Sequence, residues 1–138
     1  MIKIRNLLAA TSILMLVGCT VSGGKAAKES YTKKAEYSVD MNWQRAFKQI
    51  KDQAVLCYSG SQSWLNPRYA TGHIYSELGE AEVVVNNGDF GTYIYIEIVK
   101  DGDRAIVTGY ITISNWEGFL EELEPKIIDG EEVFDFGC

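Results

Sequence analysis

Apolar residues recur along the first half of the chain with the period of a helix. Between residues 42 and 57, apolar side chains return every three or four positions, which is typical of an amphipathic helix with one buried stripe. These side chains are Trp43, Phe47, Ile50, Ala54 and Cys57. Asp40 or Asn42 can cap the first turn, because both side chains accept hydrogen bonds from backbone N–H groups.

After the helix the pattern changes to period two. It predicts strands at 72–78, 81–86, 92–100 and 104–114, and a short strand at 36–39 before the helix. Glycine-containing turns separate the later strands, so we expect a sequential antiparallel meander. Ser114 and Glu117 match a capping box and predict a short helix that ends before Pro125. The expected fold class is α+β: an antiparallel meander of about four to five strands, with one long N-terminal helix packed on one face and a short C-terminal helix.

The strand pattern also predicts two different faces of the sheet. Ile94, Ile96 and Ile98 share one face of strand 92–100, whereas Tyr93, Tyr95 and Glu97 share the other. In the next strand Val107, Ile111 and Ile113 alternate with threonines and a tyrosine. The aliphatic face suits the helix stripe, which leaves a candidate partner-binding face formed by Tyr93, Tyr95, Tyr110, Thr108 and Thr112. The alternative is that tyrosine and threonine are simply good strand residues on a solvated face.

The start of the chain has the layout of a secretory signal. Lys3 and Arg5 precede an apolar stretch at 7–17, and Leu16-Val17-Gly18-Cys19 closes it. Eleven residues span about 16 Å as a helix, which is short of the bilayer core of about 30 Å. The four residues that end at Cys19 resemble the lipobox of bacterial lipoproteins. A plain membrane helix and an ordinary signal with a chance cysteine are the alternatives.

This resemblance implies that the chain is cleaved before Cys19 and that Cys19 is acylated, which would anchor it stably through acyl chains. The expected organisation is a signal peptide at 1–18, a lipidated flexible tether at 19–35 and a single domain at 36–138. Thr20 follows Cys19, where well-known systems use Asp to retain lipoproteins in the inner membrane. The resemblance therefore implies a lipid-anchored protein on the periplasmic face of the bacterial outer membrane. The domain itself resembles small helix-grip-like envelope lipoproteins of unassigned activity.

Two cysteines remain if Cys19 carries lipid. An even number of cysteines in an exported domain favours a disulfide, here between Cys57 and Cys138. Such a bridge closes a long loop and contributes about 4 kcal/mol to stability in the chain-entropy model. Two free thiols are the alternative, although no Cys-x-x-Cys spacing supports a redox pair.

The charge of the chain and the motifs it contains exclude several classes of function. Without 1–18 the chain has 11 basic and 19 acidic side chains, a net charge near −8, so we expect no nucleic-acid partner. His73 is the only histidine, and the chain contains no nucleophile, phosphate-loop or zinc-protease motif. Asp101-Gly102-Asp103 reads as a turn rather than a calcium loop. We therefore expect no enzyme, no metal and no cofactor.

The sequence leaves two classes of function open. One is a lipid-anchored, periplasm-facing binding or assembly module of the bacterial envelope, with an envelope protein as partner. The other is an inhibitor or small-ligand-binding lipoprotein. A flat aromatic sheet face favours the first class, whereas a closed barrel or a deep pocket favours the second.

Overall fold

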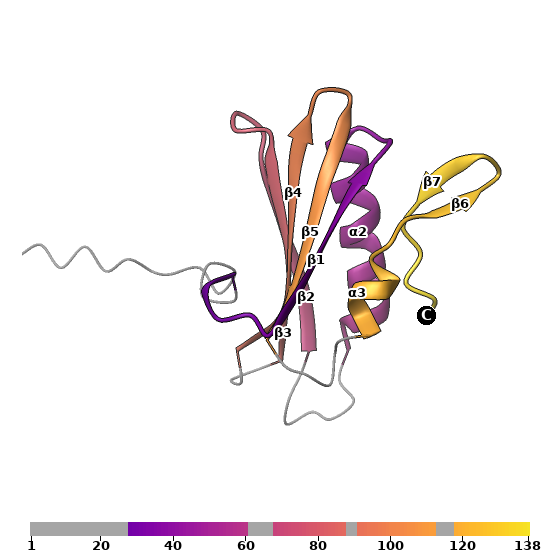
Figure 1. Cartoon of the computed structure of the whole chain (residues 1–138). Coiled ribbons are helices and arrows are strands. Elements are labelled where there is room, and N and C mark those ends of the chain that lie inside the picture. The colour runs from indigo at the N-terminus through magenta and orange to yellow at the C-terminus, as the bar shows by residue number, and fades with distance from the viewer. Residues whose placement is uncertain (1–27, 61–67, 88–90, 113–117) are drawn as a thin grey trace, which may run out of the picture.

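A five-stranded antiparallel sheet forms the centre of the molecule (Figure 1). The computed structural model describes residues 28–60, 68–87, 91–112 and 118–138. The strand order is β1-β5-β4-β3-β2. The strands are β1 (Lys33–Val39), β2 (Arg68–Tyr75), β3 (Glu80–Asn87), β4 (Thr92–Asp101) and β5 (Arg104–Ile111). Helix α2 (Trp43–Tyr58) lies across one face, which we call the inner face, so the expected α+β class is confirmed.

Helix α2 begins where the sequence places a cap. The side chain of Asn42 accepts a hydrogen bond from the backbone N–H of Gln44 at 2.9 Å, so Asn42, rather than Asp40, is the N-cap. The predicted stripe faces the sheet: Trp43, Ile50 and Ala54 are buried, and Phe47 packs against the same core. The helix is therefore held by its apolar side against the inner face.

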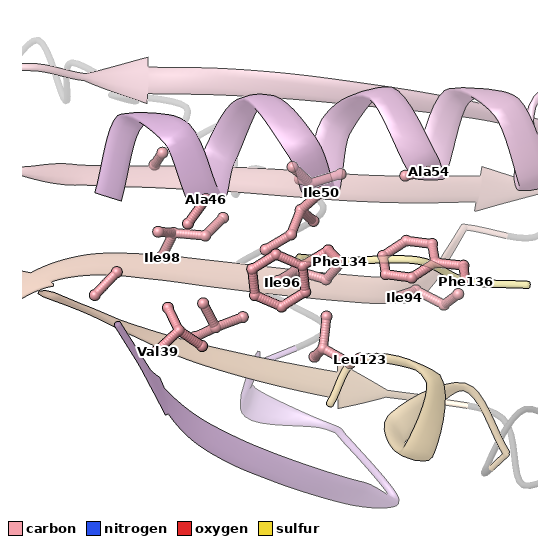
Figure 2. Close-up of a cluster of buried hydrophobic side chains, with 14 of the residues drawn as sticks. Val39, Ala46, Ile50, Ala54, Ile94, Ile96, Ile98, Leu123, Phe134 and Phe136 are labelled. Atoms are coloured by element: carbon pink, nitrogen blue, oxygen red, sulfur yellow. The ribbon is translucent and has the colours of Figure 1, made fainter. Parts of the chain in front are cut away.

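The core lies between α2, the inner face and the C-terminal segment (Figure 2). Ile94, Ile96 and Ile98 of β4 are fully buried, as the alternation predicted. Two further residues of the core, Phe134 and Phe136, come from the last residues of the chain and lie beside the helix. The inner face is therefore covered by α2 together with the C-terminal segment.

Two glycines let elements approach the inner face closely. Gly109 of β5 lies beneath Leu123, and a Cβ atom at Gly109 would lie 2.5 Å from its Cδ2. Gly72 of β2 lies beneath Phe47, where a Cβ atom would lie 2.9 Å from the ring. Any larger residue at either position would have to push these side chains away.

The C-terminal region contains more structure than predicted. Helix α3 (Gly118–Glu122) is followed by a hairpin of β6 (Lys126–Ile128) and β7 (Glu131–Val133), a pair of strands that the sequence pattern did not predict. Asp129 and Gly130 both have positive φ, which a two-residue hairpin turn of type I′ requires. This hairpin projects beside α2 in Figure 1, and Arg45 of the helix forms an ion pair with Glu131 at 2.7 Å.

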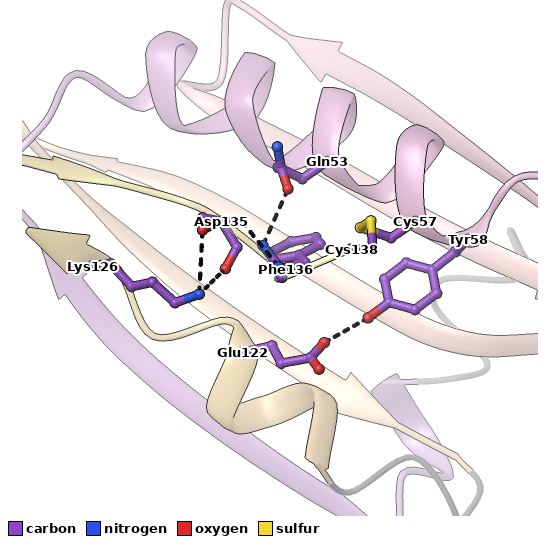
Figure 3. The surroundings of a disulfide bond; sticks show 9 residues. Gln53, Cys57, Tyr58, Glu122, Lys126, Asp135, Phe136 and Cys138 are labelled. Carbon is purple, nitrogen blue, oxygen red and sulfur yellow. Dashed lines mark hydrogen bonds and ion pairs between the residues drawn. A yellow bond between two sulfur atoms is a disulfide. The ribbon is translucent and has the colours of Figure 1, made fainter. Parts of the chain in front are cut away.

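A disulfide joins Cys57, at the end of α2, to Cys138, as the cysteine count predicted (Figure 3). The two Cα atoms are 5.5 Å apart and 81 positions apart in sequence. Two glutamines of the helix, Gln49 and Gln53, accept hydrogen bonds from the backbone N–H groups of Phe134 and Phe136, both at 3.1 Å. The bridge and the two amides together fix the final segment against α2.

The two edge strands differ in chemistry. Strand β1 carries Lys33, Lys34 and Glu36 along the edge. Strand β2 is nearly uncharged, but its first half is covered: Gly60 N–H donates to Arg68 O at 3.1 Å, and Ala70 N–H donates to Ser59 Oγ at 3.0 Å. Residues directly after α2 therefore shield the start of this edge.

Some predicted boundaries need correction or lie outside the described residues. Strand β1 begins at Lys33, so the predicted flexible tether at 19–35 extends too far into the folded part. The signal peptide at 1–18, Cys19, Ile113 and the capping box at 114–117 lie outside the described residues. Within the described part of the chain, no helix is both long enough and apolar enough to cross a membrane.

Candidate functional site: the outer face of the sheet

The face of the sheet opposite α2, which we call the outer face, carries two rows of side chains. The first row runs across all five strands through cross-strand pairs and consists of His73, Glu82, Glu97, Thr108 and Glu36. The second row lies beside it and consists of Thr71, Val84, Tyr95, Tyr110 and Lys34. A row with three carboxylates therefore lies beside a row with two tyrosines.

Three of the predicted partner-binding residues meet on this face, but they are buried. Tyr95 and Tyr110 are each 7% exposed, and they pack with Val84 in a small second core. Their rings lie 5.7 Å apart in a tilted arrangement. Thr108 is also 7% exposed. Tyr95 and Tyr110 therefore do not lie on a solvated face, and we expect their substitution to lower the stability of the fold.

Tyr93 does not share the face of Tyr95 and Tyr110. The pairing of β3 with β4 shifts between Val85 and Asn86, so Asn86 pairs with Thr92 and Tyr93 becomes the extra residue of a β-bulge. Tyr93 consequently packs against the core of the inner face. The prediction that placed Tyr93 on the tyrosine face was wrong, because strict alternation does not survive a bulge.

Thr112 lies just beyond β5 and supports the bulge. Its hydroxyl donates to the backbone carbonyl of Thr92 at 2.7 Å, and its backbone N–H donates to the carbonyl of Tyr93 at 3.1 Å. Both hydrogen bonds hold the start of β4 in place. Thr112 is thus a structural neighbour of the outer face.

Glu82 is the most enclosed carboxylate of the face, with 9% exposure. Two tyrosine hydroxyls, those of Tyr75 and Tyr95, donate to it at 3.2 Å each. Burial, together with the charge of Glu82, raises the pKa of Tyr95 and also that of Tyr75. Both phenols are therefore held neutral as donors, and Glu82 is fixed as an acceptor.

Residues 28–32 lie against the outer face, on the side away from α2 (Figure 1). The ammonium of Lys28 forms an ion pair with Glu97 at 2.7 Å. Tyr31 meets Tyr110 edge-on, with ring centroids 5.3 Å apart, and Thr32 N–H donates to Ile111 O at 2.7 Å. The hydrogen bond that Lys28 donates to Glu97 raises the pKa of Lys28 despite partial burial. The segment before β1 thus partly covers the acidic and aromatic rows.

An imidazole lies beside the acidic row at the open surface of the outer face. His73 Nδ1 lies 3.6 Å from Glu82, and the imidazole is 61% exposed on an open surface. Among the described residues, no group of three or more His, Cys, Asp or Glu side chains is arranged to hold a metal ion. Two hollows, of about 370 and 410 Å³, lie near the start of α2, and neither is lined by residues of the outer face.

Comparisons with family models, with curated proteins and with solved structures find no match to this chain. The residues of the outer face therefore have to be interpreted from their own geometry.

Sequence reasoning missed several residues that make up this face, notably Glu36, Glu82, Lys28 and Tyr31. A signal was present for Glu82, because one acid within the apolar run of β3 marks the side that faces away from the core. No comparable signal marked Lys28 or Tyr31, which lie in a segment almost without large apolar residues.

Proposed function

We propose that this chain is a lipid-anchored binding or assembly module of the bacterial envelope, which faces the periplasm and recognises a protein partner with the outer face of its sheet. The observation that carries the proposal is the outer face itself: a row of carboxylates beside buried tyrosines. Tyrosine combines a large apolar surface with a hydroxyl, which makes it a frequent anchor residue of interfaces.

The shape of the domain supports a protein partner over a small ligand. Small-molecule sites are concave and mostly apolar, and they bury most of their ligand. Among the described strands the sheet is open, with β1 and β2 as its two edge strands. The outer face is correspondingly broad, which suits contact with another macromolecule.

The lipid anchor rests on the residues Leu16-Val17-Gly18-Cys19. Mass spectrometry of the native protein should find a mature chain that begins at an acylated Cys19, and Cys19→Ala should give an unlipidated precursor or a soluble product. An unmodified Cys19 in the native protein would contradict the anchor.

The binding role can be tested by site-directed photo-crosslinking in intact envelopes. A photo-reactive residue at position 73 probes the outer face, because the His73 side chain is 61% exposed there. The matched control is position 48, on the exterior of α2, where the Lys48 side chain is 78% exposed. A discrete crosslinked protein from position 73 but not from position 48 is the expected result. Equal crosslinking from both positions, or none from position 73, would sink the proposed role.

A further inference from the structure

The acidic row of the outer face places like charges directly opposite one another. Glu82 of β3 pairs with Glu97 of β4, and Glu36 of β1 lies across Thr108 in the same row. Like charges on facing strand positions destabilise a sheet. Such an arrangement is relieved when a cation lies over the row.

The chain itself supplies such a cation. Lys28 reaches Glu97 from a segment that is remote in sequence, and the same segment places Tyr31 against Tyr110. The ammonium of Lys34 lies over the Tyr31 ring, 6.0 Å from its centroid. The segment therefore presents a lysine and an aromatic ring three positions apart, and the two rows of the face receive one each.

The contact between residues 28–31 and the outer face is made by side chains that remain about half exposed to solvent. The Lys28 side chain is 48% exposed, and Tyr31 is 40% exposed. Exposed ion pairs and single edge-on ring pairs are weak contacts, which compete poorly with a better-placed ligand of the same kind. Residues 28–31 thus occupy the outer face through contacts that are weak enough for another ligand to displace.

We propose that the outer face is a docking surface for a lysine- and aromatic-bearing segment of a partner protein, and that residues 28–31 occupy it as an internal competitor until that partner displaces them. The inference rests on the proposed function and names the chemistry of its partner. Charge complementarity supports this occupant, because residues 37–138 carry 7 basic and 17 acidic side chains. Tyr95 and Tyr110 provide the ring surface beside the carboxylates.

The test uses the full mature chain in detergent and a fluorescent, amidated peptide with the sequence of residues 28–34, Lys-Glu-Ser-Tyr-Thr-Lys-Lys. The peptide is titrated against the parent protein and against the variant Lys28→Ala/Tyr31→Ala, which removes the internal competitor. Fluorescence anisotropy should show about tenfold tighter binding to the variant, because the peptide no longer has to displace the chain's own contacts. Raised salt should weaken the binding.

Two further variants locate the bound peptide. In the Lys28→Ala/Tyr31→Ala background, Glu97→Lys should weaken binding at least about tenfold, since it places a cation where the peptide lysine would lie. If Glu97→Lys fails to fold, Glu97→Gln takes its place. This variant keeps the size of the side chain and should also weaken peptide binding. The matched control is Glu121→Lys in α3, an exposed position on the other side of the sheet, which should leave the affinity nearly unchanged.

Each outcome bears on a different part of the inference. Equal affinity for the parent and the Lys28→Ala/Tyr31→Ala variant overturns the internal competition. Absence of peptide binding to every variant, or equal weakening by Glu97→Lys and Glu121→Lys, overturns the partner chemistry. Crosslinks from position 73 in envelopes without any peptide binding would overturn this inference while leaving the proposed function in place. Peptide binding without such crosslinks would support the chemistry of the face and overturn its role in the envelope.

Discussion

The two faces of the five-stranded sheet are covered by different kinds of structure. On the inner face, fully buried isoleucines meet α2 and the phenylalanines of the last segment, and a disulfide closes this layer. On the outer face, Tyr95, Tyr110 and Glu82 are nearly as buried, yet the segment that contacts this face, through Lys28 on Glu97 and Tyr31 on Tyr110, stays half exposed. The two faces therefore differ less in how deeply their side chains are buried than in what lies over them: a disulfide-closed layer on one, and partly exposed side chains on the other.

The largest expected effect is on the inner face. Ile96→Ser should lower the free energy of unfolding by about 5 kcal/mol, because it empties a fully buried site and leaves a hydroxyl there. Urea denaturation followed by circular dichroism measures the loss. Val99→Ser, on the outer face of the same strand, is the control and should cost much less. Equal losses of stability for the two variants would mean that packing on the inner face does not contribute more to stability than packing on the outer face.

Loss of the disulfide should have the next largest effect. The double variant Cys57→Ser/Cys138→Ser should lose about 4 kcal/mol of stability, since the bridge closes a long loop in the unfolded chain. Thermal unfolding with and without reductant gives the comparison: reductant should destabilise the parent but not the variant. Non-reducing peptide mapping that finds free thiols, or a bridge between two chains, would contradict the pairing.

Tyr95 tests whether the outer face also stabilises the fold. Tyr95→Ala should cost about 3 kcal/mol, as for other large buried rings, whereas Tyr95→Phe should cost about 1 kcal/mol, because it removes only the hydrogen bond to Glu82. Chemical denaturation of both variants measures these values. A loss below about 0.5 kcal/mol for Tyr95→Ala would be typical of an exposed residue and would contradict the burial seen here.

The smallest effect concerns pH. Burial and the charge of Glu82 raise the folded-state pKa of Tyr95 above its ordinary value of 10.0, so its contribution to stability is complete below about pH 10 and is lost as the pH rises further. One tyrosine contributes a slope of at most about 1.4 kcal/mol per pH unit. Denaturation of the parent and of Tyr95→Phe at pH 8 to about pH 11 measures this slope. The decline should be shallower in Tyr95→Phe, and identical declines would rule out Tyr95 as its source.

The fold was largely predictable because periodicity reports which side chains are buried. The helix stripe from Trp43 to Cys57 and the isoleucines of β4 repeat with regular periods, and the structure places both in one core. The face of the sheet on which Tyr93 lies was not predictable. The bulge that places it on the inner face depends on how β3 and β4 pair and not on the sequence of either strand alone. The hairpin β6–β7 was also missed, because each of its strands has only three residues.

The candidate site was predictable only in part. Alternation placed Tyr95, Tyr110 and Thr108 on one face, but their burial depends on neighbours from other strands and from residues 28–32. Contacts between Lys28 and Glu97 join positions 69 apart in sequence, and no local pattern reports such a distance. Composition indicated flexible chain for this segment because its side chains are short or polar.

The cover over β2 has a consequence for how these molecules behave at high concentration. An uncovered edge strand is a template on which another chain can add its own strand, and this is a common start of aggregation. Ser59 and Gly60 occupy hydrogen-bonding groups of Ala70 and Arg68, while lysines line the opposite edge at β1. We therefore expect a neighbouring copy to find one edge charged and the start of the other already paired, which hinders the addition of a further strand when many copies are crowded together.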